Sequence, residues 1–318
     1  MCDCMKCPIC ENDIVEDSEF IVKELQMGLR EEFKYVECSH CGCLFLKDMP
    51  QDMSKYYDKN YAPHQNKDNL KNNFINKMVG LYLSDYFLIS KIVPKSKVPP
   101  IANLINNLTS NNLLDKNSSI LDVGCGRGDF LNYFKKGGFK DLTGIDLFID
   151  DENIMEGINL IQTSLEDFNS QRKFDLIISN HAFEHMDNQL VNLKCFEKLV
   201  KDSGLILLRV PVKGKFIWDR YGVNWYQIDA PRHLFLHTLK SFECLCNKTN
   251  LIIENVIFDS SYLMFTDSEK YMRDISMRDK EWNEFQFDDN EMQYFKEQAS
   301  ILNKANDADQ AIFILKLK

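Results

Sequence analysis

The stretch that decides the fold is Ser119-Ile120-Leu121-Asp122-Val123-Gly124-Cys125-Gly126-Arg127-Gly128, followed by Asp129-Phe130-Leu131-Asn132-Tyr133-Phe134. Its first five residues form a short apolar segment that is typical of a buried strand. Three glycines at alternate positions then indicate a turn, and a helical pattern begins directly after it. Glycines let the backbone approach a bound ligand closely, and the start of a helix presents N–H groups to that ligand. The stretch therefore predicts a ligand-binding strand–turn–helix unit in an α/β fold.

A second predicted strand, Leu142–Asp146, follows this unit and ends in a carboxylate. An acid at this position can accept hydrogen bonds from both ribose hydroxyls of an adenosine-containing cofactor. Asp122, two residues before the first glycine, would repel the pyrophosphate of a dinucleotide but suits a cationic ligand. The two acids therefore favour S-adenosylmethionine, which carries an ammonium and a sulfonium, over a nicotinamide cofactor.

At this point the sequence resembles the class I S-adenosylmethionine-dependent methyltransferases. Leu121–Gly128 resembles the first motif of that family and Gly144–Asp146 the second, while Phe174–His185 and Gly204–Pro211 are similar to its fourth and fifth strands. The resemblance implies an α/β fold with a Rossmann-like seven-strand sheet, mostly parallel. It also implies a set of cofactor-binding residues: Asp122, Gly124, Gly126, Asp146, Ser164, Leu165 and Asn180. Ser164 stands where the family usually has an acid, so we expect backbone groups near Leu165 to hold the adenine.

The candidate catalytic residues are histidines. Methyl transfer from a sulfonium needs a base only if the acceptor must lose a proton. Four of the six histidines fall in the loops predicted after the fourth and fifth strands, and histidine titrates near neutrality. We expect His233 to be the base, with His185 and His181 as further candidates; alternatively, His185 only packs or caps a helix. Arg232 either orients an anionic acceptor through a forked contact or forms a structural salt bridge.

Seven of the eleven cysteines lie in the first 43 residues, and four of them form two C-x2-C pairs. Two residues between cysteines let one tight turn direct both thiolates at a single ion. Strands expected at Phe20–Lys23 and Phe33–Glu37 complete a zinc ribbon. We expect a structural Zn²⁺ bound by Cys7, Cys10, Cys38 and Cys41. Iron as the metal, or a substitution by Cys2, Cys4 or Cys43, stays open.

The resemblance extends to a bacterial subgroup. The cysteine pairs, Tyr56-Tyr57, and Trp225 followed by Asp229–His233 recur together in zinc-ribbon methyltransferases of sugar, surface-polysaccharide or secondary-metabolite pathways. The resemblance implies a small-molecule acceptor such as a sugar, a nucleotide-sugar or a surface-glycan precursor. An RNA methyltransferase with a zinc knuckle and a non-catalytic scaffold that binds S-adenosylmethionine are the alternatives. A net charge of −10 argues against a nucleic acid partner.

The chain divides into five predicted parts: a zinc ribbon at 1–46, a helical connector at 47–110, the methyltransferase domain at 111–259, a helical insertion at 260–308 and a final strand at 309–318. The insertion is too long for a hairpin turn, so we interpret it as a lid over the acceptor pocket, with a peripheral or dimer-contact helix pair as the alternative. No apolar run reaches the roughly 18 residues of a spanning helix, and the N-terminus lacks the apolar core of a signal peptide. We therefore expect a cytoplasmic protein without membrane insertion, whose oligomeric state stays open.

Overall fold

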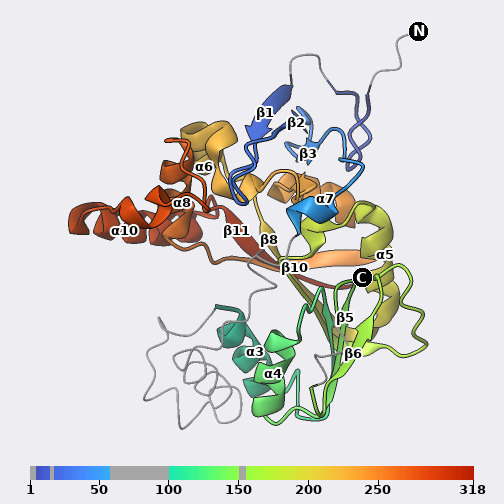
Figure 1. Ribbon diagram of the computed structural model, residues 1–318. Coiled ribbons are helices and arrows are strands. Elements are labelled where there is room, and N and C mark those ends of the chain that lie inside the picture. Colours follow the sequence, from blue (N-terminus) through green and yellow to red (C-terminus); the bar gives the residue numbers. More distant parts are fainter. Residues whose placement is uncertain (1–4, 15–17, 58–99, 150–154) are drawn as a thin grey trace. The chain divides into compact units, whose positions relative to one another are not determined.

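The computed structural model describes residues 5–14, 18–57, 100–149 and 155–318 (Figure 1). The chain forms two units: unit 1 comprises residues 1–61, 183–190 and 209–313, and unit 2 comprises residues 62–182, 191–208 and 314–318. Cys2, Cys4 and most of the predicted connector lie outside the described residues. The five-part division predicted from the sequence stays a prediction.

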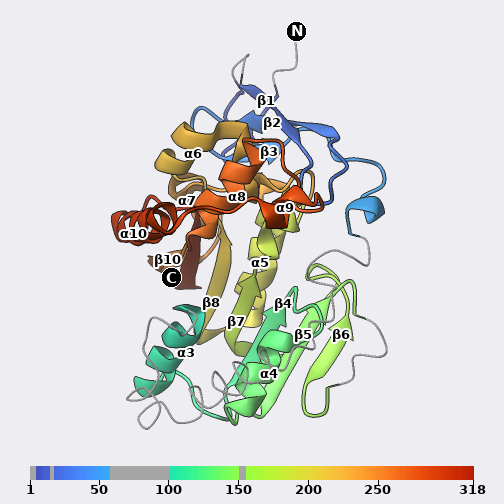
Figure 2. The same cartoon turned by 60° about the vertical axis from the view of Figure 1, so that its left-hand side comes forward.

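Unit 2 contains the strand–turn–helix stretch. Strand β4 (Ser119–Val123) pairs in parallel with β5 (Asp141–Asp146) and with β7 (Phe174–Asn180), and β5 pairs in parallel with β6 (Asn159–Gln162). All five residues of β4 are buried, as expected for a central strand of a parallel sheet. Figure 2 shows these four strands side by side. The helices of this part are α3 (Pro100–Ser110), α4 (Asp129–Lys136) and α5 (Gln189–Leu199).

The complete sheet has seven strands in the order β10-β11-β8-β7-β4-β5-β6. The three strands not yet introduced are β8 (Val200–Pro211), β10 (Leu251–Phe258) and β11 (Gln310–Leu317). Strands β8 and β11 each contribute residues to both units. The last strand of the chain is therefore inserted between β8 and β10, and the predicted seven-strand α/β sheet is confirmed.

A second sheet, in unit 1, contains the predicted ribbon strands. Strand β1 (Glu19–Lys23) pairs antiparallel with β2 (Glu32–Glu37), which pairs antiparallel with β3 (Leu44–Leu46), and Figure 1 shows the three together in blue. Strand β9 (Phe235–Leu236) completes this sheet by pairing with β3. Two residues from late in the chain thus join the N-terminal strands in one four-strand sheet.

Helices make up most of the remainder of unit 1. They are the 3₁₀ helices η1 (Ser54–Tyr56), η4 (Phe183–His185), η5 (Gly222–Asn224) and η6 (Tyr226–Ile228), and the α-helices α6 (Lys215–Tyr221), α7 (Leu239–Cys246), α8 (Leu263–Tyr271), α9 (Glu281–Glu284) and α10 (Asp289–Ala305). The predicted insertion is helical, and its helices α8 and α10 pack through the stacked rings of Phe265 and Phe295, 5.2 Å apart. Among the described residues, no helix is both long and apolar enough to span a bilayer.

Candidate functional site

The glycine turn in unit 2 follows β4 and leads into α4. Gly124 has a φ of +75°, and a Cβ added there would lie 2.2 Å from the Cβ of Ala182. No larger residue fits this position without displacing the chain after β7. Gly126 also has a positive φ, but a Cβ added to it would meet no atom within 4 Å. The turn is therefore closely packed at its first glycine and open at its second, where backbone is available to a ligand.

Two acids lie at the ends of the strands that flank this turn. Asp122 in β4 is 2% exposed, and burial together with the charge of Asp146 raises its pKa to about 7. Asp146, the last residue of β5, accepts hydrogen bonds from the amide N of Gly126 (2.9 Å) and of Phe148 (2.8 Å). Because the charge of Asp146 disfavours the ionisation of Asp122, a cation bound beside Asp122 would be stabilised.

The other predicted cofactor residues follow the neighbouring strands. Ser164, two residues after β6, forms a side-chain hydrogen bond of 2.6 Å with Asp167, and Leu165 beside it is buried. Asn180 is the last residue of β7. The carboxyl ends of neighbouring parallel strands form one edge of a sheet, where open α/β folds bind ligands. The structure therefore brings the seven predicted cofactor residues to the same edge of unit 2.

A second polar cluster, in unit 1, contains two of the three predicted catalytic histidines. Glu184 and His185 belong to η4, and one ligand atom from each of them and from His233 lies within 4.8 Å of the others. Nε2 of His233 lies 3.8 Å from Oε1 of Glu184 and 3.7 Å from Oδ2 of Asp229. The two imidazole rings are 4.7 Å apart. His181 has a φ of +54° and belongs to unit 2. The cluster of Glu184, His185 and His233 does not include it.

Backbone carbonyls fix the proton positions on both imidazoles. Nδ1 of His233 lies 2.7 Å from the carbonyl O of Gln227, and Nδ1 of His185 lies 2.9 Å from that of Arg232. Since a carbonyl only accepts, each Nδ1 donates its hydrogen to the carbonyl it contacts. Nδ1 of His185 also lies 3.2 Å from the hydroxyl of Tyr57. Burial, and then the nearby His185, lower the pKa of His233 to about 4. His233 is therefore neutral near pH 7, as a proton acceptor must be.

Arg232 is a structural residue. It is fully buried, its Nε lies 3.0 Å from both carboxylate oxygens of Asp229, and its Nη2 lies 2.9 Å from Oε1 of Glu24. Of the two interpretations of Arg232, the structure supports the salt bridge. Glu24, which follows β1, was missed by the sequence analysis because no local pattern connects it with a residue 208 positions away.

His237 is also structural. It is fully buried, and its ring nitrogens bond to Gln189 (2.9 Å) and Ser241 (3.1 Å).

The N-terminal cysteines form the cluster that their spacing predicts. The ligand atoms of Cys7, Cys10, Cys38 and Cys41 all lie within 4.8 Å of one another. Sγ of Cys7 lies 3.7 Å from Sγ of Cys41, and Sγ of Cys10 lies 3.5 Å from Sγ of Cys38. Four thiolates around a tetrahedral zinc are about 3.8 Å apart, so both of these Sγ–Sγ distances are close to the spacing that the ion requires. Cys43 is buried but is not part of the cluster.

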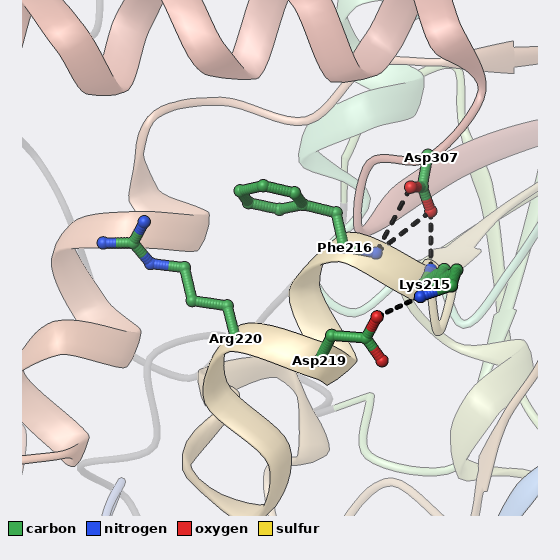
Figure 3. A pocket seen from close by; sticks show the side chains of 5 residues that line it. All are labelled: Lys215, Phe216, Asp219, Arg220 and Asp307. Carbon is green, nitrogen blue, oxygen red and sulfur yellow. Dashed lines mark hydrogen bonds and ion pairs between the residues drawn. The ribbon is translucent and has the colours of Figure 1, made fainter.

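A surface hollow in unit 1 is lined by Lys215, Phe216, Asp219, Arg220 and Asp307 (Figure 3). The carboxylate of Asp307 faces the first amides of α6 and accepts a hydrogen bond of 3.2 Å from the amide N of Phe216. Lys215 forms an ion pair with Asp219. The hollow is a capped helix start with a surface ion pair, and we assign no ligand to it.

Comparison with known proteins identifies the domain that contains the glycine turn. Residues 99–256 match a family model described as a methyltransferase domain. Malonyl-[acyl-carrier protein] O-methyltransferase of Priestia megaterium is 30% identical over 120 residues, which cover 36% of this chain and 43% of that protein. (S)-Coclaurine N-methyltransferase of Papaver somniferum is 28% identical over 103 residues, 28% of each chain. The chain thus matches less than half the length of either relative.

Among solved structures, the chain is similar to coclaurine N-methyltransferase bound to N-methylheliamine and S-adenosylhomocysteine. The sequence identity is 13% and the TM-score 0.46, over 85% of this chain and 83% of that one. The family match shows that residues 99–256 form a methyltransferase domain of the S-adenosylmethionine-dependent class.

Proposed function

We propose that this protein transfers a methyl group from S-adenosylmethionine to a small-molecule acceptor. The observation that carries the proposal is the glycine turn with Asp122 and Asp146 on either side, inside a matched methyltransferase domain. A sulfonium donor is already activated, so most of the acceleration comes from holding the acceptor in line with the methyl carbon. Such a site needs a fixed cofactor more than it needs strong acid–base groups.

Each cofactor residue has a proposed task. The backbone at Gly124 and Gly126 approaches the methionyl part, and Asp122 balances its positive charge. Asp146 accepts hydrogen bonds from the ribose hydroxyls. Its carboxylate gives up the hydrogen bond from the amide N of Gly126 when the cofactor binds. Ser164, Leu165 and Asn180 complete the pocket, with backbone near Leu165 holding the adenine.

The acceptor side of the proposal rests on the histidines and on the resemblance to the zinc-ribbon subgroup. We propose that His233, His185 and His181 act on the acceptor and promote the loss of its proton. The proposed acceptor is a sugar, a nucleotide-sugar or a surface-glycan precursor. The two relatives named above are an O- and an N-methyltransferase, so they leave the accepting atom open.

Four further features belong to this proposal. The cluster of Cys7, Cys10, Cys38 and Cys41 holds a structural Zn²⁺ with all four positions filled. The helices between residues 260 and 308 serve as a lid over the acceptor. A cytoplasmic location and a possible assembly into oligomers stay predictions.

Calorimetry with S-adenosylhomocysteine tests the cofactor assignment. We expect one binding site per chain, and Asp146→Asn should weaken binding about tenfold because the ribose loses a charged acceptor. An exposed acid of the same unit, Asp202, provides the control: Asp202→Asn should bind like the wild type. Binding of a nicotinamide dinucleotide in place of S-adenosylhomocysteine would contradict the proposal.

Transfer of a radiolabelled methyl group tests the acceptor. Sugar nucleotides should become labelled, and bulk transfer and ribosomal RNA should not. Labelling of RNA would favour the zinc-knuckle RNA methyltransferase, and cofactor binding without labelling of any acceptor in cell extract would favour the non-catalytic scaffold.

A further inference from the structure

Glu184, His185 and His233 together have the composition of a metal site. Two imidazoles and one carboxylate offer ligand atoms within 4.8 Å of one another, in unit 1 and apart from the cysteine cluster. Glu184 is fully buried, His233 is 7% exposed and His185 is half-buried, so the cluster is enclosed on most sides. We propose that these three residues bind a divalent first-row transition metal ion.

The orientation of the imidazoles supports this assignment. Histidines that bind a metal usually donate their other ring N–H to a carbonyl or carboxylate, which fixes the tautomer and directs the lone pair at the ion. Both histidines have this arrangement: Nδ1 of His233 bonds to the carbonyl O of Gln227, and Nδ1 of His185 to that of Arg232. The backbone therefore restricts the orientation of both rings.

The buried charges around the cluster also favour a cation. Glu24, Asp229 and Glu184 are three carboxylates that are each at most 9% exposed. The guanidinium of Arg232 contacts Asp229 and Glu24, while Oε1 of Glu184 faces Nε2 of His233 across 3.8 Å. Buried negative charge is costly, and a divalent ion bound by Glu184 and the two imidazoles would compensate part of it.

The ligand set limits the class of ion. Imidazole nitrogen suits Mn²⁺, Fe²⁺, Co²⁺ and Zn²⁺, whereas Mg²⁺ and Ca²⁺ prefer oxygen alone. Bonds of about 2.1 Å place neighbouring ligand atoms roughly 3 to 3.5 Å apart, so the cluster must contract by about 1 Å on binding. The half-buried His185 side chain and the carboxylate of Glu184 provide that adjustment. Three protein ligands leave coordination positions open for a substrate.

The role of this ion in catalysis rests on the proposed function. An acceptor hydroxyl bound at an open position would lose its proton to water more readily, because the cation stabilises the alkoxide. The oxygen lone pair then forms the bond to the methyl carbon, and the electrons of the S–CH₃ bond stay on sulfur, giving S-adenosylhomocysteine. On this inference His185 and His233 promote proton loss as ligands of the ion. The sequence-based expectation of His233 as a free base stays a prediction.

Titration of the full-length chain with Mn²⁺ tests the site. Mn²⁺ prefers nitrogen and oxygen to thiolate, so the zinc-filled ribbon does not compete. Electron paramagnetic resonance measures the free ion, and we expect one Mn²⁺ bound per chain. Glu184→Gln and His185→Gln should raise the Kd at least about tenfold, since each removes a ligand. His40→Gln is the matched control, because His40 is exposed and outside the cluster.

Co²⁺ provides a second measurement that depends on no variant. Bound to the cluster in wild-type protein, it should give weak visible bands without the strong near-ultraviolet absorption of cobalt thiolate. Wild-type protein that binds neither ion, or His185→Gln protein that binds Mn²⁺ as tightly as the wild type, would overturn the proposal. Circular dichroism shows whether each variant is folded. Calorimetry with S-adenosylhomocysteine, which tests unit 2 alone, separates a failure of this site from a failure of the proposed function.

Discussion

At the scale of single residues, Asp122 shows how a proposed cofactor residue can lower the free energy of unfolding. It is an acid buried in the central strand, with a pKa raised to about 7 by burial and by Asp146. In the unfolded chain the same group ionises near pH 4, so the folded state binds an extra proton between about pH 4 and pH 7. The contribution of Asp122 to the free energy of unfolding is therefore fully present below about pH 4, and it is lost as the pH rises to about 7.

Asp122→Asn should reverse this loss. We expect the variant to be more stable than the wild type at about pH 8, by up to about 4 kcal/mol, and equally stable near pH 4. Its affinity for S-adenosylhomocysteine should fall, because the ammonium of the ligand loses a charge partner. Urea denaturation at both pH values measures the first effect and calorimetry the second. Asp202→Asn removes an exposed acid of the same unit and should change neither; an Asp122→Asn variant that is less stable than the wild type at the higher pH would contradict the argument.

Gly124→Ala should be strongly destabilising. The new Cβ meets Ala182 at 2.2 Å, and the φ of +75° is unfavourable for any residue with a Cβ. Overlap and backbone strain together should cost about 2 to 4 kcal/mol and abolish cofactor binding. Gly157→Ala is the matched control, because Gly157 has the same φ but its added Cβ would lie 3.5 Å from the flexible end of Lys135. That variant should lose only about 1 kcal/mol.

A second substitution separates the two causes at Gly124. Ala182→Gly removes the atom that the new Cβ would meet, so the Gly124→Ala/Ala182→Gly double variant should recover the part of the stability that is due to overlap. Urea denaturation of the four proteins forms a double-mutant cycle. Additive losses would show that Ala182 is not the cause.

At the scale of elements, helix α7 begins at a residue that also contacts the cysteine cluster. Thr238 accepts a hydrogen bond from the amide N of Ser241 (3.0 Å) in a capping box, and its hydroxyl donates to the carbonyl O of Cys41 (2.6 Å). Thr238→Ala removes both bonds and should cost about 1 to 2 kcal/mol in unfolding free energy. Thr238→Ser keeps the hydroxyl and should lose less than half as much. Equal losses in the two variants, measured by urea denaturation, would assign the effect to the methyl group, which packs on Gly42.

The elements also show which parts of the fold could be predicted from the sequence. Strands β4 and β5 and the glycine turn between β4 and α4 were predicted because each depends on a short local pattern. Strand β9 was not, because two residues have no periodicity and their partner strand β3 lies far earlier in the chain. His185 and His233 were expected in separate loops; their contact with Glu184 and the bond from Arg232 to Glu24 depend on long-range packing, which no local pattern reports.

At the scale of the whole molecule, the cysteine cluster is connected to the cluster of Glu184, His185 and His233 within unit 1. Strand β3 follows the second cysteine pair and pairs with β9, and the hydroxyl of Tyr35 in β2 donates to the carbonyl O of His233 (2.8 Å). The predicted ribbon is therefore part of the same unit as the histidine cluster. Binding of a structural metal stabilises the folded state by several kcal/mol or more, so its loss should affect this unit first.

Removal of the proposed ribbon metal should therefore lower the stability of unit 1 and leave cofactor binding by unit 2 unchanged. All three tryptophans, Trp218, Trp225 and Trp282, belong to unit 1, so their fluorescence reports the unfolding of that unit. After treatment with a strong chelator, the urea midpoint of tryptophan fluorescence should fall. The affinity for S-adenosylhomocysteine, whose proposed residues all belong to unit 2, should change by less than about threefold because none of them depends on the metal.

A matched pair of cysteine variants tests whether the fall in the fluorescence midpoint is caused by loss of the metal from the cysteine cluster and not by another effect of the chelator. Cys10→Ser removes one of the four thiolates and should lower the fluorescence midpoint without any chelator, whereas Cys244→Ser, outside the cluster, should leave it unchanged. If cofactor affinity fell together with the midpoint, unit 2 would need the metal-bound unit 1 in order to fold. An unchanged midpoint in the Cys10→Ser protein would instead mean that the four cysteines contribute nothing to stability through a metal.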